Sequence, residues 1–239
     1  MTQDLDVAKK RLAVAHRVTV LTGAGVSAES GVPTFRGAEG LWRNFRPEEL
    51  ATPQAFANDP KLVWDWYDWR RGLIAPLNPN PGHVAIAKME GQFPEFLLVT
   101  QNVDGLHRLA GNKKIAELHG NIWFTRCTDE GTIAENRQVP MPEIPPRCRC
   151  GALLRPHIVW FGESLDYDVF QSVLSACRAC DVLVVAGTSS VVHPAASLAG
   201  MAKDSGAFVI EVNPEETPIT DFVDVHLRGK SGEMLPLLI

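Results

Sequence analysis

The sequence lacks an excess of basic charge and lacks any long hydrophobic run. Its formal net charge is -5 over 239 residues, so no overall basic field favours nucleic acid or an anionic membrane surface. No apolar run approaches the roughly 18 residues that a membrane-spanning helix needs. Residues 1–16 contain no apolar signal core and have the pattern of an amphipathic helix, so we expect a cytoplasmic protein. No internal repeat or low-complexity segment is visible.

Cysteine is scarce, and its few occurrences are clustered. The five cysteines are Cys127, Cys148, Cys150, Cys177 and Cys180. In a reducing compartment such clusters suggest a metal site or simple packing rather than disulfides. Cys177 and Cys180 end a predicted helix that leads into an apolar strand, so we interpret this pair as packing.

What the chain does have is enough apolar sequence for a core, arranged as strands and helices in alternation. Hydrophobic residues make up 45% and charged residues 21%, as in soluble globular proteins. Short apolar runs end in glycine or polar clusters, which is typical of strands buried in a parallel sheet; they span 17–22, 95–100, 181–187 and 207–212. Helical segments such as 167–180 and 194–205 lie between them. The pattern predicts an α/β fold, a Rossmann-like parallel sheet with helices on both faces.

Two segments interrupt this alternation. Residues 31–82 are rich in proline, tryptophan and phenylalanine, and residues 121–157 are rich in turn residues and cysteine. We predict that they form a small inserted module. The remaining segments, 1–30, 83–120 and 158–239, would then form the discontinuous Rossmann-like domain.

A glycine-rich turn follows the first predicted strand. Gly23, Gly25 and Ala28 fit the pattern G-x-G-x-x-[G/A], whose backbone N–H groups can approach a pyrophosphate. Alone this match is a weak signal, because a tight strand-to-helix turn has the same pattern. No second strand ending in an acid follows at the usual spacing of about 20 residues. Instead comes a Gly/Pro loop with Phe35 and Arg36, which could fold over a bound nucleotide.

Polar side chains follow the predicted strand 95–100 directly. Gln101, Asn102 and Asp104 would form a polar floor at the carboxyl end of the sheet, where α/β proteins bind ligands. The alternative is a turn that caps the next helix. Further on, His119 precedes a glycine and is a candidate general base near neutral pH. Local sequence alone favours a structural histidine there, as for any one of the seven histidines.

Six motifs occur in one order between residues 23 and 218: GAGVSAESGVPTFR, TQNVDGLH, LHG, RPHIVWFGE, GTSSVVHPA and VNPEETP. This set closely resembles the sirtuins, the NAD-dependent protein lysine deacylases. The resemblance implies a catalytic group of His119, Asn102 and Asp104. It also implies that NAD is held by Gly23, Ala24, Gly25, Ser27, Ala28, Glu29, Phe35, Arg36, Trp42, Gln101, Asn102, Asp104, Gly187, Thr188, Ser189, Asn213, Glu215 and Ser231.

The chemistry implied by the resemblance consumes NAD as a co-substrate. The oxygen of an acyl-lysine amide attacks the nicotinamide ribose, nicotinamide leaves, and His119 acts as general base on a ribose hydroxyl that attacks the acyl carbon. The partners are therefore NAD and acylated lysine side chains of proteins. The segment 159–162, with Val159, Phe161 and Gly162, is expected to pair with an extended substrate peptide.

One branch of that family prefers succinyl, malonyl and glutaryl groups, and its mark is a Tyr-x-x-Arg pair. Tyr67 and Arg70 supply this pair, and they share a face if 61–74 is helical. Ala51 falls where the branch keeps a small residue, which leaves room for a longer acyl chain. A charge-assisted bond to the acyl carboxylate would be worth about 1.5–3 kcal/mol, or roughly one to two decades of preference.

A structural alternative exists for these side chains. Arg70 could stack on Trp66 as a cation–π pair, and Arg71 could pair with Asp68 on the surface. The family context favours the acidic-acyl pocket, with some deacetylase activity kept.

The metal site of the family is matched only in part. Cys127, Cys148 and Cys150 fit three of four zinc-binding cysteines, and Glu130 stands where the fourth is expected. A Cys3Glu site, a site with a water ligand and a chain without metal are all open, and any zinc would be structural.

Two functions besides the deacylase are open from the sequence. One is a non-catalytic NAD or ADP-ribose sensor, and the other is a protein ADP-ribosyltransferase. The presence of His119, Asn102 and Asp104 argues against the sensor, and Tyr67 and Arg70 would be idle in the transferase. We further expect a monomer with no nucleic-acid or membrane partner.

Overall fold

The computed structural model describes residues 2–33 and 50–239. The helices are α1 (Thr2–Ala13), α2 (Ala24–Ala28), α4 (Pro53–Asn58), α5 (Pro60–Ile74), α6 (Pro81–Gln92), α7 (Leu106–Leu109), α8 (Tyr167–Ala179), α9 (Leu198–Asp204) and α10 (Ser231–Met234), with 3-10 turns η1 (Ala195–Ser197) and η2 (Leu235–Leu238). The strands are β1 (Arg17–Thr22), β2 (Glu95–Thr100), β3 (Ile115–Glu117), β4 (Gly120–Cys127), β5 (Ile133–Glu135), β6 (Leu154–Ile158), β7 (Val182–Ala186), β8 (Phe208–Asn213) and β9 (Val225–Arg228).

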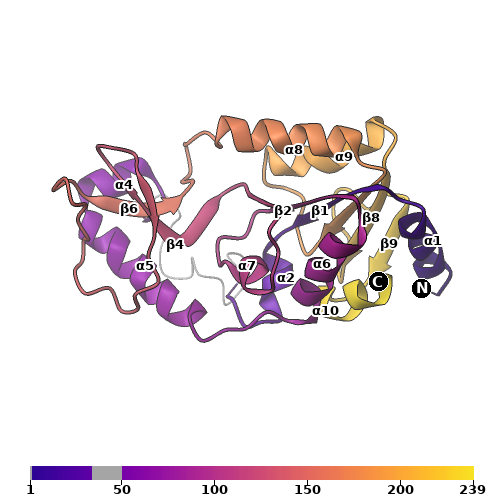
Figure 1. The fold of residues 1–239 in the computed structure, drawn as a ribbon, viewed down its shortest axis with the longest axis horizontal. Coiled ribbons are helices and arrows are strands. Elements are labelled where there is room, and N and C mark those ends of the chain that lie inside the picture. The colour runs from indigo at the N-terminus through magenta and orange to yellow at the C-terminus, as the bar shows by residue number, and fades with distance from the viewer. Residues whose placement is uncertain (1, 34–49) are drawn as a thin grey trace.

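The larger part of the molecule is a six-stranded parallel sheet in the order β3-β2-β1-β7-β8-β9. Alternate residues of its central strands face two separate cores. On one face Val18 and Val20 pack with α1, α6 and α10. On the other face Leu21 packs with α8 and α9 (Figure 1). The predicted α/β class, a parallel sheet with helices on both faces, is confirmed.

The strand order reverses beside β1, and this reversal determines where a ligand site can form. The chain runs outward from β1 to β2 and β3, then returns to the other side of β1 for β7, β8 and β9. The connections therefore separate at the carboxyl ends of β1 and β7, which leaves a crevice there. Thr22 and Ala186 mark these two strand ends and lie opposite each other.

The smaller part combines a three-stranded antiparallel sheet, β5-β4-β6, with α4 and α5. It has a core of its own that is rich in tryptophan. Helix α5 begins where the sequence dictates, because Asp59 accepts a hydrogen bond from the Leu62 N–H at 2.9 Å and Pro60 occupies the first turn. Strand β4 begins at Gly120 and β6 ends at Ile158, next to the expected module boundaries.

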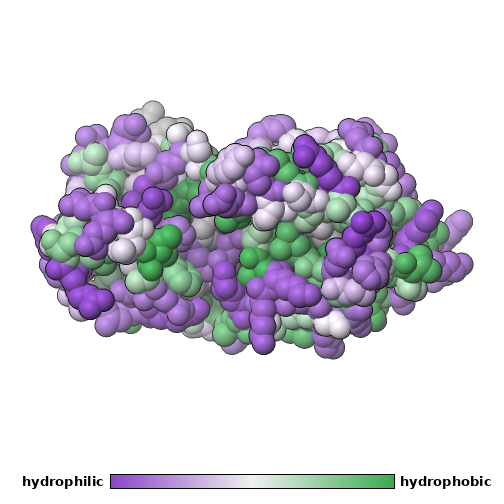
Figure 2. Space-filling view, turned by 45° about the horizontal axis from the view of Figure 1, so that its top comes forward, coloured by the Kyte–Doolittle hydropathy of each residue, from purple (hydrophilic) through white to green (hydrophobic). Residues whose placement is uncertain are grey.

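The two parts meet at a notch that is visible in the space-filling view, and on the face shown hydrophilic residues are spread over both parts (Figure 2). Among residues 2–33 and 50–239 we find no helix with the length and apolar character to cross a membrane.

Candidate active site

The residues expected to hold NAD come from the ends of four neighbouring strands, and side-chain hydrogen bonds link them. Asn102 donates from Nδ2 to the Gly23 carbonyl at 3.0 Å, which joins the end of β2 to the end of β1. Gln101 donates from Nε2 to the Thr188 hydroxyl at 3.1 Å, and Asn213 donates to the Thr188 carbonyl at 2.8 Å. The carboxyl edge of the sheet is therefore one connected polar surface.

The glycines of the first turn are needed for packing between two turns. The Gly25 N–H donates to the Gly187 carbonyl at 2.7 Å, and a Cβ on Gly25 would lie 2.7 Å from that oxygen. Gly187 has φ +60, and a Cβ there would lie 2.4 Å from the Val26 nitrogen. The tight turn, which was the alternative explanation of the glycine pattern, is therefore present in the structure.

The other expected NAD residues lie at the rim of this edge or outside the described structure. Glu29 accepts a hydrogen bond from the Gly232 N–H at 2.8 Å, which brings the buried Ser231 and the start of α10 next to α2. Ala28, Ser189 and Glu215 are exposed, and Ala24 is half-buried. Phe35, Arg36 and Trp42 fall outside the described residues.

His119 is half-buried between β3 and β4, and the carbonyl group of the residue directly after β2 orients its ring. Its Nδ1 lies 3.0 Å from the Gln101 carbonyl oxygen, which can only accept, so Nδ1 holds the proton. The lone pair is then on Nε2. Burial lowers the pKa of His119, and the bond to Gln101 partly opposes this effect. The imidazole is neutral at pH 7 and can serve as a base.

Asn102 and Asp104 are connected through Ser27. Asn102 also donates from Nδ2 to the Ser27 hydroxyl at 3.1 Å, and Asp104 accepts from the Leu106 N–H at 2.8 Å. Burial raises the pKa of Asp104, while the bonds from Leu106 and Ser27 and the nearby charge of Arg70 lower it. The bond to Leu106 is the helix-capping turn that we considered as an alternative, so Asp104 has this structural role as well.

Two buried histidines beneath this group were not anticipated from the sequence. The Asn80 N–H donates to Nδ1 of His83 at 3.3 Å, so Nε2 of His83 carries a proton toward the Ser27 hydroxyl at 3.3 Å. His107 lies 4.7 Å from His83 between ring centroids and contacts the Thr22 hydroxyl at 3.0 Å. Burial lowers the pKa of His83 to about 4 and that of His107 well below its usual value. Both rings are neutral supports for the polar edge.

Tyr67 and Arg70 lie one turn apart on α5 and are almost fully buried, at 1% and 3% exposure. Burial raises the pKa of Tyr67 to about 12, with the charge of Arg70 and a bond from Trp160 opposing it. Burial lowers the pKa of Arg70 to about 10, with Tyr67 and Asp104 opposing it. At neutral pH the pair therefore presents a phenol hydroxyl and a positive charge, close enough to Asp104 to affect its pKa.

The structural alternative for the arginines is right for one and wrong for the other. Arg70 does stack on Trp66, with its guanidinium carbon 5.4 Å from the ring centroid. Stacking uses the face of a guanidinium, whereas two-pronged carboxylate binding uses its edge, so the contact is compatible with an acyl pocket. Arg71 is fully buried and donates to the Asn136 carbonyl. The alternative of a surface pair with Asp68 is wrong, because Arg71 is not at the surface; the Asp68 carboxylate accepts from the Met141 N–H, and its charge raises the pKa of Arg71.

A match to the Sir2 family model spans residues 23–194, from the glycine turn to the segment after β7. The chain belongs to the Sir2 family. It is 59% identical over 216 residues to an NAD-dependent protein deacylase of Aquifex aeolicus (strain VF5), with 90% of each chain covered. It is 53% identical over 232 residues to one of Leptospira interrogans serogroup Icterohaemorrhagiae serovar Lai, covering 94% of this chain and 92% of that one. A solved Sir2 homolog–NAD complex is 48% identical with a TM-score of 0.92, covering 98% and 91%.

In this Sir2-family protein, the segment expected to pair with substrate makes backbone hydrogen bonds to other parts of the chain. The Val159 N–H donates to the His119 carbonyl, and the Phe161 N–H donates to the Ala51 carbonyl, both at 2.9 Å. Residues 159–162 follow β6 without being a strand, and they end in a turn at Gly162. Strand addition at this segment would therefore have to use its carbonyl oxygens or the backbone of Gly162.

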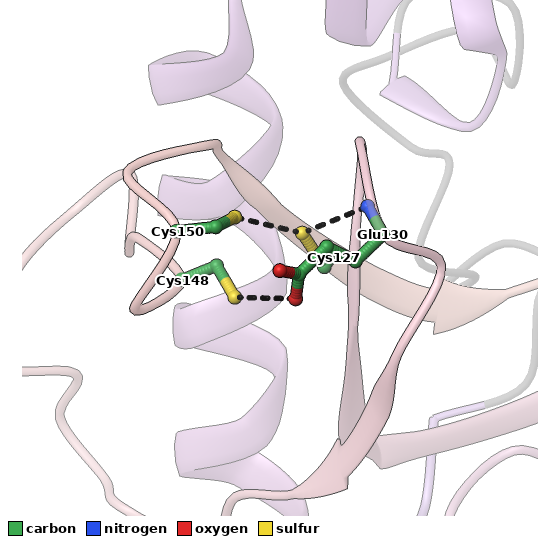
Figure 3. Close-up of side chains that lie close together, drawn as sticks. All are labelled: Cys127, Glu130, Cys148 and Cys150. Carbon is green, nitrogen blue, oxygen red and sulfur yellow. Dashed lines mark hydrogen bonds between the residues drawn. The ribbon is translucent and has the colours of Figure 1, made fainter.

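The cysteine-rich segments form a compact cluster of four side chains. Cys127 is the last residue of β4 and Glu130 lies in the turn that follows, while Cys148 and Cys150 come from the turn before β6 (Figure 3). Their four ligand atoms all lie within 4.8 Å of one another. The Glu130 N–H also donates to the Cys127 sulfur at 3.4 Å, which orders the first turn around the cluster.

The spacing of these donors fits a tetrahedral zinc. With ordinary Zn–S and Zn–O bonds, the edges of such a site are about 3.8 Å between two sulfurs and about 3.6 Å between sulfur and oxygen. The Cys127–Cys150 sulfur separation is 3.5 Å, and the Cys148 sulfur lies 3.9 Å from Glu130 Oε2. These two pairs are opposite edges of one tetrahedron. Three thiolates and a carboxylate would fill the coordination sphere, so the zinc would have a structural role.

Proposed function

We propose that this Sir2-family protein is an NAD-dependent protein lysine deacylase with a preference for acyl groups that end in a carboxylate, such as succinyl and malonyl. The deacylase activity follows from family membership and from relatives more than half identical in sequence. The acyl preference is the finer part of the proposal. It is supported by Tyr67 and Arg70.

The proposed chemistry assigns His119 a single task. The amide oxygen of an acyl-lysine attacks the anomeric carbon of the nicotinamide ribose, and the bond to nicotinamide breaks. Nε2 of His119, whose other nitrogen is held by the Gln101 carbonyl, removes a proton from a ribose hydroxyl. The resulting oxygen attacks the acyl carbon. With one water molecule the products are free lysine, nicotinamide and O-acyl-ADP-ribose.

The observation that carries the acyl preference is the burial of a positive charge. Arg70 is 3% exposed, and its pKa of about 10 keeps it charged at neutral pH. A buried guanidinium is costly unless a negative or aromatic group compensates it. Arg70 stacks on Trp66, and Tyr67 and Asp104 favour its charge; the carboxylate of a succinyl group would add an opposite charge beside it. An acetyl group offers no such charge.

Neither competing function has an observation in its favour. A sensor would not need the oriented base at His119, and an ADP-ribosyltransferase would leave the Tyr67–Arg70 pair without a task. A monomeric state and a cytoplasmic location stay predictions from the sequence.

The test compares matched succinyl-lysine and acetyl-lysine peptides, with and without NAD, by mass spectrometry. We expect NAD-dependent loss of succinyl with a kcat/KM at least 10-fold above that for acetyl, on the order of one charge-assisted bond. The Arg70→Met variant should lose most of the succinyl activity and keep the acetyl activity. Faster acetyl removal by the wild-type protein would overturn the acyl preference. Equal losses on both peptides in the variant would make Arg70 structural.

A further inference from the structure

We propose that Trp160 is a positioning residue for acyl selectivity, because its indole N–H fixes the direction in which the Tyr67 hydroxyl donates. The proposal rests on the proposed function, since it concerns the same acyl pocket. It adds a specificity determinant that lies outside the Tyr-x-x-Arg pair and 93 residues away from Tyr67 in sequence.

The contact on which this depends is a single buried hydrogen bond. Nε1 of Trp160 donates to the Tyr67 oxygen at 2.9 Å. Both side chains are almost fully buried, at 2% and 1% exposure, so this bond is not exchanged for one to bulk water. An indole nitrogen can only donate, so Tyr67 must be the acceptor and keeps its own proton for another partner.

The direction of that proton follows from the geometry of a phenol. A phenol O–H prefers the plane of the ring and has two orientations there, one on each side of the C–O bond. A donor that approaches the oxygen from one side excludes the orientation that points toward it. Trp160 therefore selects one orientation of the Tyr67 hydroxyl before any substrate binds. With a pKa of about 12, Tyr67 stays protonated and can donate over the physiological range.

Trp160 can act in this way because its own ring is held on several sides. The Arg155 guanidinium lies 3.5 Å from the indole centroid, and the Phe56 ring lies 5.3 Å away. Glu163 fixes the backbone by accepting from the Trp160 N–H at 2.8 Å, and it also binds Arg155 through both carboxylate oxygens. A donor fixed by packing loses little entropy on forming its bond, so its orienting effect is retained.

The neighbours of Trp160 connect this bond to the reacting centre. Val159 donates to the backbone of His119, and Phe161 donates to the backbone of Ala51, the expected small residue of the acyl pocket. One three-residue stretch thus contacts the base, the position that allows a long acyl chain and the hydroxyl that would bind its end. We expect the acyl preference and the position of the base to be established together by this stretch.

The test measures kcat/KM for succinyl and acetyl peptides in four proteins: wild type, Trp160→Phe, Tyr67→Phe and the double variant. Trp160→Phe keeps an aromatic ring and removes the N–H. We expect the succinyl-to-acetyl ratio to fall about 5- to 10-fold, the effect of one neutral hydrogen bond. The double variant should have the same succinyl-to-acetyl ratio as Tyr67→Phe, because without the Tyr67 hydroxyl the Trp160 N–H has nothing to orient.

Trp64→Phe is the matched control. Trp64 is a second buried tryptophan of the same module, and its indole N–H donates to the Leu154 carbonyl at 2.7 Å, away from Tyr67. This variant should lose some thermal stability and leave the succinyl-to-acetyl ratio unchanged. Because the ratio is taken within each protein, a partly folded preparation still reports it.

A measurement on the wild-type protein keeps the proposal testable if Trp160→Phe does not fold. In the 15N-indole spectrum, the signal that Tyr67→Phe displaces belongs to Trp160. A Tyr67 hydroxyl that donates to a carboxylate becomes a better acceptor, so a succinyl peptide should move this indole proton downfield. An acetyl peptide should move it less.

The outcomes separate this inference from the proposed function. If the wild-type protein shows no succinyl preference, the proposed function fails and the role of Trp160 fails with it. If the wild type shows the preference and Tyr67→Phe loses it while Trp160→Phe keeps it, only the inference is overturned. Equal losses on both peptides in Trp160→Phe, matching those of Trp64→Phe, would likewise overturn it and leave Trp160 a packing residue.

Discussion

At the scale of single residues, the oriented imidazole of His119 makes the sharpest prediction. The His119→Ala variant should lose turnover by about 10²- to 10⁴-fold, the usual contribution of a positioned general base. NAD should still bind, because the polar edge formed by Asn102, Gln101 and Thr188 is untouched. Calorimetric titration with NAD and single-turnover assays would measure the two effects. A variant with full activity would exclude His119 as the base.

The pH dependence follows from two groups with opposite signs. His119 acts as a base only when neutral, and burial lowers its pKa, so kcat/KM should fall only as the pH drops through a value below 6.5. Arg70 holds a carboxylate only when charged. The succinyl-to-acetyl ratio should therefore be flat from pH 7 to pH 9 and fall as the pH approaches about 10.

Profiles of kcat/KM against pH on both peptides would measure the acid fall in kcat/KM and the alkaline fall in the succinyl-to-acetyl ratio. The Arg70→Met variant is the control for the alkaline fall, because it lacks the guanidinium whose titration would change the succinyl-to-acetyl ratio. An acid limb above pH 7 would contradict the assignment of His119 as a buried neutral base.

A site residue could be predicted from the sequence when its partner lies close to it along the chain. Tyr67 and Arg70 are one helical turn apart, so local spacing and the family resemblance were enough to pair them. The role of Trp160 could not be predicted, because its hydrogen bond to Tyr67 joins positions 93 residues apart. His83 was missed for a similar reason. Its local pattern indicates only a helix cap, and its contact with Ser27 depends on the fold.

At the scale of elements, the turn that positions His119 depends on one glycine. Gly120 has φ +78, and a Cβ there would lie 2.1 Å from the His157 carbonyl oxygen on β6. Gly120→Ala should separate β4 from β6, displace His119 and cost more than about 2 kcal/mol of unfolding free energy. Activity and denaturant unfolding would both report the loss.

Gly111→Ala is the control for this substitution. Gly111 has φ +110, but a Cβ there meets nothing within 4 Å. This variant measures the backbone strain alone, and we expect it to keep most of its activity. Equal effects in the two variants would mean that the close approach to His157 does not matter.

The metal cluster allows a prediction about its fourth ligand. Cobalt can replace zinc and reports each bound thiolate through charge-transfer absorption. Glu130→Cys should add a thiolate to the three present and raise this absorption by about a third, while Glu130→Ala should weaken metal binding. Removal of the metal with a chelator should lower the Tm of the wild type. Equal metal affinity in wild type and Glu130→Ala would exclude Glu130 as a ligand.

The elements themselves were predictable where burial on both faces makes a strand continuously apolar. The predicted run 181–187 contains β7, which is buried throughout, and the predicted helix 167–180 matches α8 to within a residue. The edge strands β3 and β9 were missed because they are short and mix polar with apolar residues. The antiparallel sheet of the module was missed for other reasons: β5 is short and exposed, and β4, although eight residues long, leads into a segment rich in turn residues and cysteine.

At the scale of the whole molecule, the candidate site lies where the two parts of the chain meet. The Rossmann-like sheet supplies the polar edge at which we propose that NAD binds, and the module supplies α5, which carries the proposed acyl-binding pair. His119 lies at the junction, directly before β4, and its backbone binds the stretch after β6. This division explains why a single glycine motif was a weak signal. The catalytic arrangement needs both parts, and only the ordered set of motifs indicated them together.

The stability of the sheet should depend on pH through the carboxylate of Asp181, which joins the neighbouring strands β1 and β7. Asp181, just before β7, accepts from the backbone N–H groups of His16 and Arg17 at 2.9 and 2.8 Å, and from the Arg17 guanidinium. These bonds lower the pKa of Asp181 to about 2 from its usual 3.8. Because the folded pKa is depressed, this stabilisation is complete above pH 4 and is lost as the pH falls toward 2.

Asp181→Asn should therefore lower the Tm at pH 7 by roughly 2–4 °C, which is about one lost hydrogen bond in a chain of this size. The difference from wild type should shrink as the pH is lowered from 4 toward 2, as followed by scanning calorimetry. Glu135→Gln is the control, because the Arg137–Glu135 pair is half exposed on both sides and should contribute little at any pH. A Tm difference for Asp181→Asn that stays the same from pH 4 to pH 2 would show that the cause is the shape of the side chain, since the Asp181 charge is being lost over this range.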